Sequence, residues 1–260
     1  MVSAGSLTAR LLLEPQELTV LRRCLPQGMR EGAPTAAPDE QVLARLRSRD
    51  VIEADGTVHR SILAGLVLLA DPNAVRLSVI AAGPVLARHT SIALSDQLLA
   101  GLTVEEPSGR AEQFLARTGE IATELVRLLP ELGLPAGADR TSLRDVEPGP
   151  LLVAVQRAQR GQGPDPEFGT REGGTPSAFA DGFLGSLSVT LSLPAGAVAD
   201  EPVLDRLLWV ATPGGWWSLR PHTDRSGRAV LDVVPAVPGQ LAGELAPMLA
   251  AAALALGGPQ

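Results

Sequence analysis

The side chains that most often carry out catalysis are few in this sequence and are spread along it. The three histidines are His59, His89 and His222. No two of them have the spacing of an H-E-x-x-H zinc motif, and no G-x-S-x-G nucleophile elbow is present. This pattern favours structural or solvated histidines. A hydrolase that gathers serine, histidine and aspartate from distant segments remains an alternative.

Acidic residues occur close together at Asp39-Glu40, at Glu105-Glu106 and at Asp165/Glu167. Catalysis by paired carboxylates requires two groups held about 5–9 Å apart in a cleft. The first pair instead suits the start of a helix, where negative charge is favourable. The second pair suits the end of a strand. The sequence gives no reason to place any of these pairs in a cleft.

Several mechanisms are excluded by side chains that the chain lacks. All 22 basic residues are arginine, so no lysine can form a Schiff base or bind a nucleotide phosphate. The single Cys24 excludes an intrachain disulfide and a cysteine-based zinc site. The glycines 161, 163 and 169 do not form a G-x-G-x-x-G loop. We therefore predict a protein that is not an enzyme, with no catalytic residues, no metal and no cofactor.

A group of arginines surrounds an expected helix–turn–helix with an Asp55-Gly56 turn, a pattern typical of winged-helix DNA-binding proteins. Its members are Arg45, Arg47, Arg49 and Arg60. Nearby acidic residues cancel most of this charge, and the whole chain carries a net charge of −7. Because nucleic-acid binding relies on neutralising phosphates, we expect no nucleic-acid partner. A winged-helix regulatory module remains an alternative.

The pair Trp216-Trp217 is the feature that best fits contact with a partner protein. Adjacent residues of a strand point to opposite faces, so both rings are buried only if both faces of the sheet are covered. Core packing of both rings and exposure of one ring are both consistent with the sequence. Tryptophan is a common anchor of protein interfaces. Trp216 and Trp217 are therefore the candidate partner-binding residues.

The periodicity of apolar residues predicts the elements that hold these side chains. Apolar residues make up 45% of the chain and aromatic residues 3%, so the core must be aliphatic. Helices are expected at 15–25, 39–49, 62–70 and 151–160. Two longer helices follow from apolar stripes, at 114–132 and 241–255. Period-two alternation predicts strands at 75–79, 85–94, 102–104, 187–193, 207–210, 216–220 and 230–234.

The order of these elements divides the chain into two similar halves. Residues 1–135 form an N-terminal half and residues 136–260 a C-terminal half, together in one compact domain, with 161–176 as a mobile loop. Each half reads as a β-hairpin, a further strand and a long helix. The helix stripes align at an offset of 127, which places Phe114 on Leu241 and Leu125 on Ala252. We predict an α+β fold with a central antiparallel sheet, flanking helical bundles and a quasi-two-fold repeat of two β-β-β-α halves.

No segment is expected to enter a membrane. The N-terminus lacks the long apolar region of a signal peptide. The apolar run at 245–256 is shorter than the roughly 20 residues needed to span a bilayer, and Pro247 interrupts it. Together with the single cysteine, these features favour a cytoplasmic protein.

The stretches 43–72 and 207–253, the second beginning within the hairpin sequence RLLWVATPGGWWSLRP, carry a family resemblance. In pattern and element order the chain resembles the EspG family, the cytosolic chaperones of type VII (ESX) secretion systems in mycobacteria and other actinobacteria. The resemblance implies a chaperone or adaptor that binds helical secreted substrates, of PE–PPE or WXG type, and keeps them soluble for export. It implies no catalytic residues, and it transfers no contact position to this chain.

Overall fold

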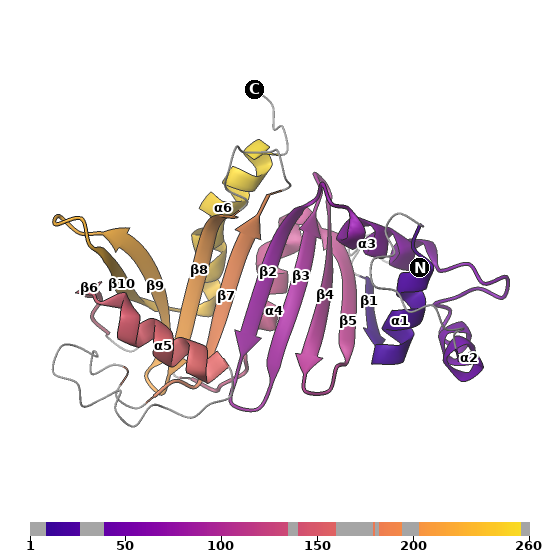
Figure 1. Cartoon of the computed structure of the whole chain (residues 1–260), viewed down its shortest axis with the longest axis horizontal. Coiled ribbons are helices and arrows are strands. Elements are labelled where there is room, and N and C mark those ends of the chain that lie inside the picture. Colours follow the sequence, from indigo (N-terminus) through magenta and orange to yellow (C-terminus); the bar gives the residue numbers. More distant parts are fainter. Residues whose placement is uncertain are drawn as a thin grey trace.

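One continuous antiparallel sheet runs through the computed structural model (Figure 1). The structure describes residues 9–26, 39–134, 140–159, 179, 182–193 and 203–255. Within these ranges the sheet has ten strands in the order β1-β5-β4-β3-β2-β7-β8-β9-β10-β6. The segment 161–176, expected to be a mobile loop, lies outside the described residues.

The elements alternate between short helices and runs of sequential strands. In the first half they are β1 (Ala9–Leu13), α1 (Pro15–Arg23), α2 (Glu40–Ser48), α3 (Arg60–Ala70), β2 (Val75–Ala82), β3 (Ala87–Leu94), β4 (Leu98–Glu106), β5 (Ala111–Arg117), the 3₁₀ turn η2 (Thr118–Glu120) and α4 (Ile121–Leu128). In the second half they are β6 (Leu143–Val146), α5 (Pro148–Gln159), β7 (Gly185–Ser192), β8 (Val203–Thr212), β9 (Gly215–Thr223), β10 (Ala229–Ala236), the 3₁₀ turn η4 (Pro238–Gln240) and α6 (Leu241–Ala255).

The helix boundaries follow the residues that predicted them. Pro15 occupies the first turn of α1, where its missing N–H costs nothing. Asp39 caps α2, because its carboxylate accepts a hydrogen bond from the Gln41 backbone N–H at 2.8 Å. The helix α3 ends at Ala70, just before Asp71-Pro72. The sequence predictions of α1, α2, α3, α5 and α6 are confirmed in type and approximate bounds.

The helix predicted at 114–132 is wrong over its first part, because 111–117 forms β5. Phe114 lies opposite Gly101 of β4, and its ring fills the space that a side chain at Gly101 would need. The helix α4 begins only at Ile121 and ends at Leu128. The offset of 127, which aligned Phe114 with the first residue of α6, is therefore wrong. The edge strands β1 and β6 were not predicted either.

Helices cover both faces of the sheet. The largest core cluster lies between one face and the helices α4 and α6, and it includes Leu77, Leu125, Leu187, Trp209 and Leu245. The other face is covered in two places. The helices α1, α2 and α3 bury one cluster over β4 and β5, and α5 buries another over β8, β9 and β10. In Figure 1, α5 lies in front of the sheet and α4 and α6 lie behind it.

The two halves meet in the middle of the sheet. Strand β2 pairs with β7 over a seven-residue register that includes Val79 opposite Val189. On the covered side of this seam, α4 packs against α6. The fold is α+β with a large antiparallel sheet, as predicted. No helix in the described part of the chain is long and apolar enough to cross a membrane.

Candidate functional site

Trp216 and Trp217, the candidate partner-binding residues, both lie in the core of the second half. Their side chains point to opposite faces of β9, and they are 6% and 4% exposed. The Trp216 ring packs near Trp209, and the Trp217 indole N–H donates a hydrogen bond to Thr212 Oγ1 at 3.2 Å. Both rings are buried because both faces of the sheet are covered here. Neither ring is presented for contact by this chain alone.

Arg140 closes the end of β9 over Trp217. Its guanidinium carbon lies 4.8 Å from the centre of the Trp217 ring, and Nη1 donates a hydrogen bond to the Trp216 carbonyl at 3.0 Å. Burial lowers the pKa of Arg140, because desolvation disfavours its charge. A Cβ at Gly215 would lie 2.6 Å from Arg140 Nη1. Arg140 thus stabilises the start of β9, where Trp216 and Trp217 lie.

Glu244 of α6 joins the last helix to the sheet. Its Oε2 accepts hydrogen bonds from Ser218 Oγ at 2.7 Å and from the Trp209 indole N–H at 2.9 Å. Its Oε1 accepts one from Arg220 Nη2 at 2.6 Å. Burial opposes the charged form, but these donors outweigh it, and the pKa of Glu244 lies below its usual value. No sequence motif marks this network, because the acceptor lies on α6 and the donors lie on β8 and β9.

Arg10 of β1 has a corresponding place in the first half. Its guanidinium donates hydrogen bonds to Glu112 Oε1 at 2.8 Å and to Glu124 of α4, and it lies 5.2 Å from the centre of the Phe114 ring. Desolvation alone would lower the pKa of Arg10. The two carboxylates more than offset this, so that pKa is raised. Arg10 therefore fastens the edge strand to the helix that covers it.

A groove of about 1400 Å³ surrounds Arg10 and extends along β1 toward α1 and α2. Its charged lining consists of Arg10, Arg45, Arg49, Arg88, Arg110, Arg127, Glu14, Glu17, Glu105, Glu112, Glu124 and Glu131. Most of these side chains form ion pairs with one another, and their formal charges sum to zero. None of the three histidines lines the groove. The arrangement holds elements together. Among the described residues of its lining, the hydroxyls of Ser48 and Thr103 contact the Arg45 carbonyl and Thr90, and neither contacts a side-chain base.

Two of the arginines that suggested a DNA-binding module, Arg45 and Arg49, instead form ion pairs in this groove. Glu17 is 2% exposed, and its carboxylate pairs with Arg49 at 3.0 Å and with Arg45 at 3.7 Å. Arg49 also donates a hydrogen bond to the Leu12 carbonyl of β1 at 2.5 Å. Both arginines therefore neutralise a buried acid. Of the predicted group, Arg47 and Arg60 are exposed without that role.

An Arg49→Ala variant is expected to destabilise the fold by about 1–2 kcal/mol, because it removes the nearer arginine partner of a buried carboxylate while Arg45 remains. Chemical denaturation of the purified variant measures this. Arg47→Ala, at an exposed position of α2 two residues before Arg49, is the matched control and should change the free energy of unfolding by less than about 0.5 kcal/mol. Equal losses in the two variants would contradict a structural role for the Arg49–Glu17 pair.

The three histidines lie on separate elements. His59 precedes α3 and contacts Ser61 Oγ at 2.9 Å, while His89 of β3 lies 3.7 Å from Glu106. His222 of β9 contacts Asp145. Among the described residues, no contact joins a serine, a histidine and an aspartate into one site. No group of three potential metal ligands forms within those residues either.

The centre of the sheet carries a polar surface on the face opposite α4 and α6. One row across β3, β2, β7 and β8 places Ser91, Ser78, Thr190 and Arg206 side by side. His89 lies in the next row, beside Ile80. Of these, Ser78, His89, Ser91 and Arg206 are exposed. We call the surface formed by Ser78, His89, Ser91, Thr190 and Arg206 the open face.

The neighbouring helices leave the open face uncovered in the described part of the chain. The helix α3 packs over β3, β4 and β5, and α5 contacts β7, β10 and β2, but both helices leave Ser78, His89 and Ser91 exposed. In Figure 1 the broad faces of β2 and β3 lie toward the viewer, between α5 and α3. The reverse sides of the same strands carry buried aliphatic residues such as Val79 and Val189. Successive side chains of these strands therefore point alternately to a buried aliphatic face and to a hydroxyl-rich surface.

Comparison with known proteins gives no family for this chain. No protein-family model matches it, and no curated protein is similar to it. Among solved structures, one match is the dehydratase domain of PpsC from Mycobacterium tuberculosis in complex with C12:1-CoA. The two are 12% identical over 90% of this chain and 93% of that chain, with a TM-score of 0.16. A superposition of that quality carries no argument about fold or function.

Proposed function

We propose that this protein is a cytoplasmic chaperone or adaptor of a type VII secretion system, similar to EspG, which binds helical secretion substrates and keeps them soluble for export. The observation that carries the proposal is the open face, a polar strip at the centre of a two-sided sheet, flanked by α3 and α5. A surface of hydroxyl, imidazole and guanidinium groups can hydrogen-bond to the polar end of a helical hairpin. Binding of this kind requires no catalytic residue.

The second support is a quasi-two-fold repeat, which the structure allows us to propose in a revised form. Each half has four sequential strands, a 3₁₀ turn and a helix, namely β2 to α4 and β7 to α6. The unit is thus β-β-β-β-α, with one more strand than the sequence predicted. The seam between β2 and β7 lies at the centre of the sheet, with four strands of each unit arranged outward from it in the same order.

The repeat is closest at the helices, where positions correspond at an offset of 120. Glu124 corresponds to Glu244, and each carboxylate accepts a hydrogen bond from an arginine on the sheet. The buried residues Ile121, Leu125 and Leu128 correspond to Leu241, Leu245 and Met248. An experimental structure in which the two units fail to superpose with Glu124 on Glu244 would overturn the repeat.

A duplicated unit places the open face at the pseudo-symmetric centre of the molecule. Val79 pairs with Val189 at the seam. The two-fold relation that exchanges these two residues also exchanges His89 and Arg206, so one basic side chain lies on either side of the seam. A partner that binds there meets both halves at once. We therefore place the contact with helical substrates on the open face and on the adjacent helices, rather than on the buried tryptophans.

Co-purification tests this function. The protein is co-expressed with PE–PPE-like or WXG-type proteins encoded beside it, and retention of a substrate is measured by affinity capture and by gel filtration. Ser78→Arg and Ser91→Arg add a long charged side chain to the open face, and we expect each to weaken retention at least about tenfold. Thr123→Arg, on the exposed side of α4 behind the sheet, is the control and should bind normally.

The outcomes separate the function from the surface. If the wild-type protein retains none of these substrates, the chaperone function is wrong. If it retains one and both serine variants bind as well as Thr123→Arg, the function stands and the open face is not the contact. Circular dichroism of each variant confirms that the sheet is intact before binding is compared.

A further inference from the structure

The edge strand β6 is held to the sheet by few backbone contacts. It has four residues, and its register with β10 shows only Leu231 opposite Val146 and Val233 opposite Leu143, with an irregularity between them. Asp145, in the middle of the strand, has a φ of 55°, which an L residue rarely adopts in a strand. Side-chain contacts therefore have a large share in holding β6 in place.

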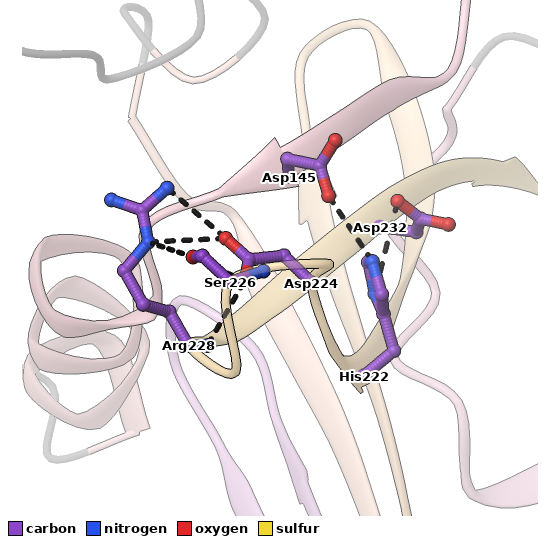
Figure 2. A network of polar contacts seen from close by, with 6 residues as sticks. All are labelled: Asp145, His222, Asp224, Ser226, Arg228 and Asp232. Atoms are coloured by element: carbon purple, nitrogen blue, oxygen red, sulfur yellow. Dashed lines mark hydrogen bonds and ion pairs between the residues drawn. The ribbon is translucent and has the colours of Figure 1, made fainter.

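One histidine reaches across three neighbouring strands to provide such a contact. His222 of β9 has its Nε2 3.2 Å from Asp145 Oδ1 of β6 and its Nδ1 3.9 Å from Asp232 Oδ1 of β10. Figure 2 shows the imidazole ring between the two carboxylates. The side chain of His222 is 38% exposed, so solvent protons reach it.

The two protonation states of His222 differ in how well they fit this position. A neutral imidazole has one N–H, so it can donate to only one of the two aspartates. The imidazolium has two N–H groups and a positive charge, and it can interact favourably with both. Asp232 Oδ1 is buried and has no hydrogen-bond partner. The nitrogen that faces this oxygen is Nδ1 of His222, at 3.9 Å.

Two of the other charged groups around the ring, Arg220 and Asp224, have partners elsewhere. Arg220 lies opposite Asp232 in the β9–β10 register, but its guanidinium donates to Glu244 of α6. Asp224, in the turn after β9, accepts hydrogen bonds from Ser226 and Arg228, and these hold its pKa far below the usual value. Arg144, beside Asp145 on β6, is exposed. Imidazole is the group of this cluster that ordinarily changes charge between about pH 5 and pH 8.

We propose that His222 is a protonation-dependent latch for β6: its cationic form fastens the strand to the sheet through Asp145 and Asp232, and its neutral form holds the strand less tightly. The favourable charge interactions are present at low pH and are lost as pH rises and the ring loses its proton. Release of β6 leaves the outer backbone groups of β10 unpaired, an edge to which another strand can be added. The latch does not depend on the function proposed above.

Hydrogen exchange of the β6 and β10 backbone amides, corrected for the intrinsic pH dependence of exchange, tests the latch. In the wild-type protein we expect opening of β6 to become roughly fivefold more frequent between about pH 5.5 and pH 8, as befits partly exposed ion pairs. His222→Gln keeps a hydrogen-bond donor without a titrating charge, so this pH dependence should disappear. Asp145→Asn should also reduce it.

His89→Gln, which removes a comparably exposed histidine on β3, is the matched control and should retain the wild-type dependence. Flat exchange of β6 across this range in the wild-type protein would overturn the latch. So would an unchanged pH dependence in His222→Gln. Exchange in β2 and β7, at the centre of the sheet, reports whether any variant has loosened the whole fold.

Discussion

A Gly101→Ala variant is expected to lose about 3 kcal/mol or more of folding free energy, because the added methyl group has no space. A Cβ at this position would lie 1.9 Å from Phe114 Cζ, with two further ring atoms within 2.5 Å. Phe114 is 2% exposed and lies beneath Arg10, so its ring cannot move aside without disturbing the covered core. Urea denaturation followed by circular dichroism measures the loss.

The matched control is Gly119→Ala in η2, where no atom lies within 4 Å of the added methyl group. That change should be neutral within about 0.5 kcal/mol. The clash is isolated by adding Phe114→Ala. If the ring is the obstacle, the double variant is more stable than the summed losses of the single variants imply. Additive losses, or a stable Gly101→Ala protein, would contradict the close packing of β4 against β5.

A Glu244→Ala variant is expected to destabilise the protein by about 2–3 kcal/mol, because it leaves several hydrogen-bond donors without their acceptor. Trp209 is fully buried and Ser218 is 0% exposed, so neither can turn to water instead. Glu244→Gln keeps one carbonyl oxygen and should lose less. The free energy of unfolding of each variant, measured near neutral pH, tests the order of these effects.

The control for this pair is Glu131→Ala, which removes an exposed glutamate and should have little effect. A pH series adds a second test. The folded pKa of Glu244 lies below its unfolded value, so its stabilisation is present above the unfolded pKa and is lost as pH falls through the folded pKa. The difference between wild type and Glu244→Ala should therefore shrink on acidification. A constant difference down to about pH 3 would contradict the role of the charged form.

Local signals predicted the helices well, because the residues that start and stop them act within a few positions. Asp39 caps α2 through a contact two residues away, and Pro15 sits in the first turn of α1. The stripe that begins at Phe114 was misleading for the same reason. Its apolar spacing fits a helix, but Phe114 belongs to a strand whose partners, β4 and β1, are chosen by long-range pairing.

The candidate sites show the same division between local and distant information. Adjacent residues in a strand point to opposite faces, and this was enough to see that Trp216 and Trp217 are both buried only beneath two covered faces. Nothing local indicated that Glu244 would collect donors from β8 and β9. The open face was equally hidden, since Ser78 and Thr190 become neighbours only when β2 pairs with β7.

The seam between β2 and β7 also determines when the sheet can close during synthesis. Val79 and Val189 pair across it, although 110 positions separate them in the chain. At elongation rates of about 5–20 residues per second, the inner edge of β2 waits roughly 5–20 s for its partner strand. Throughout that interval the nascent first half has a long unpaired strand edge beside an aliphatic face. The nascent protein is therefore prone to aggregation for several seconds each time it is translated.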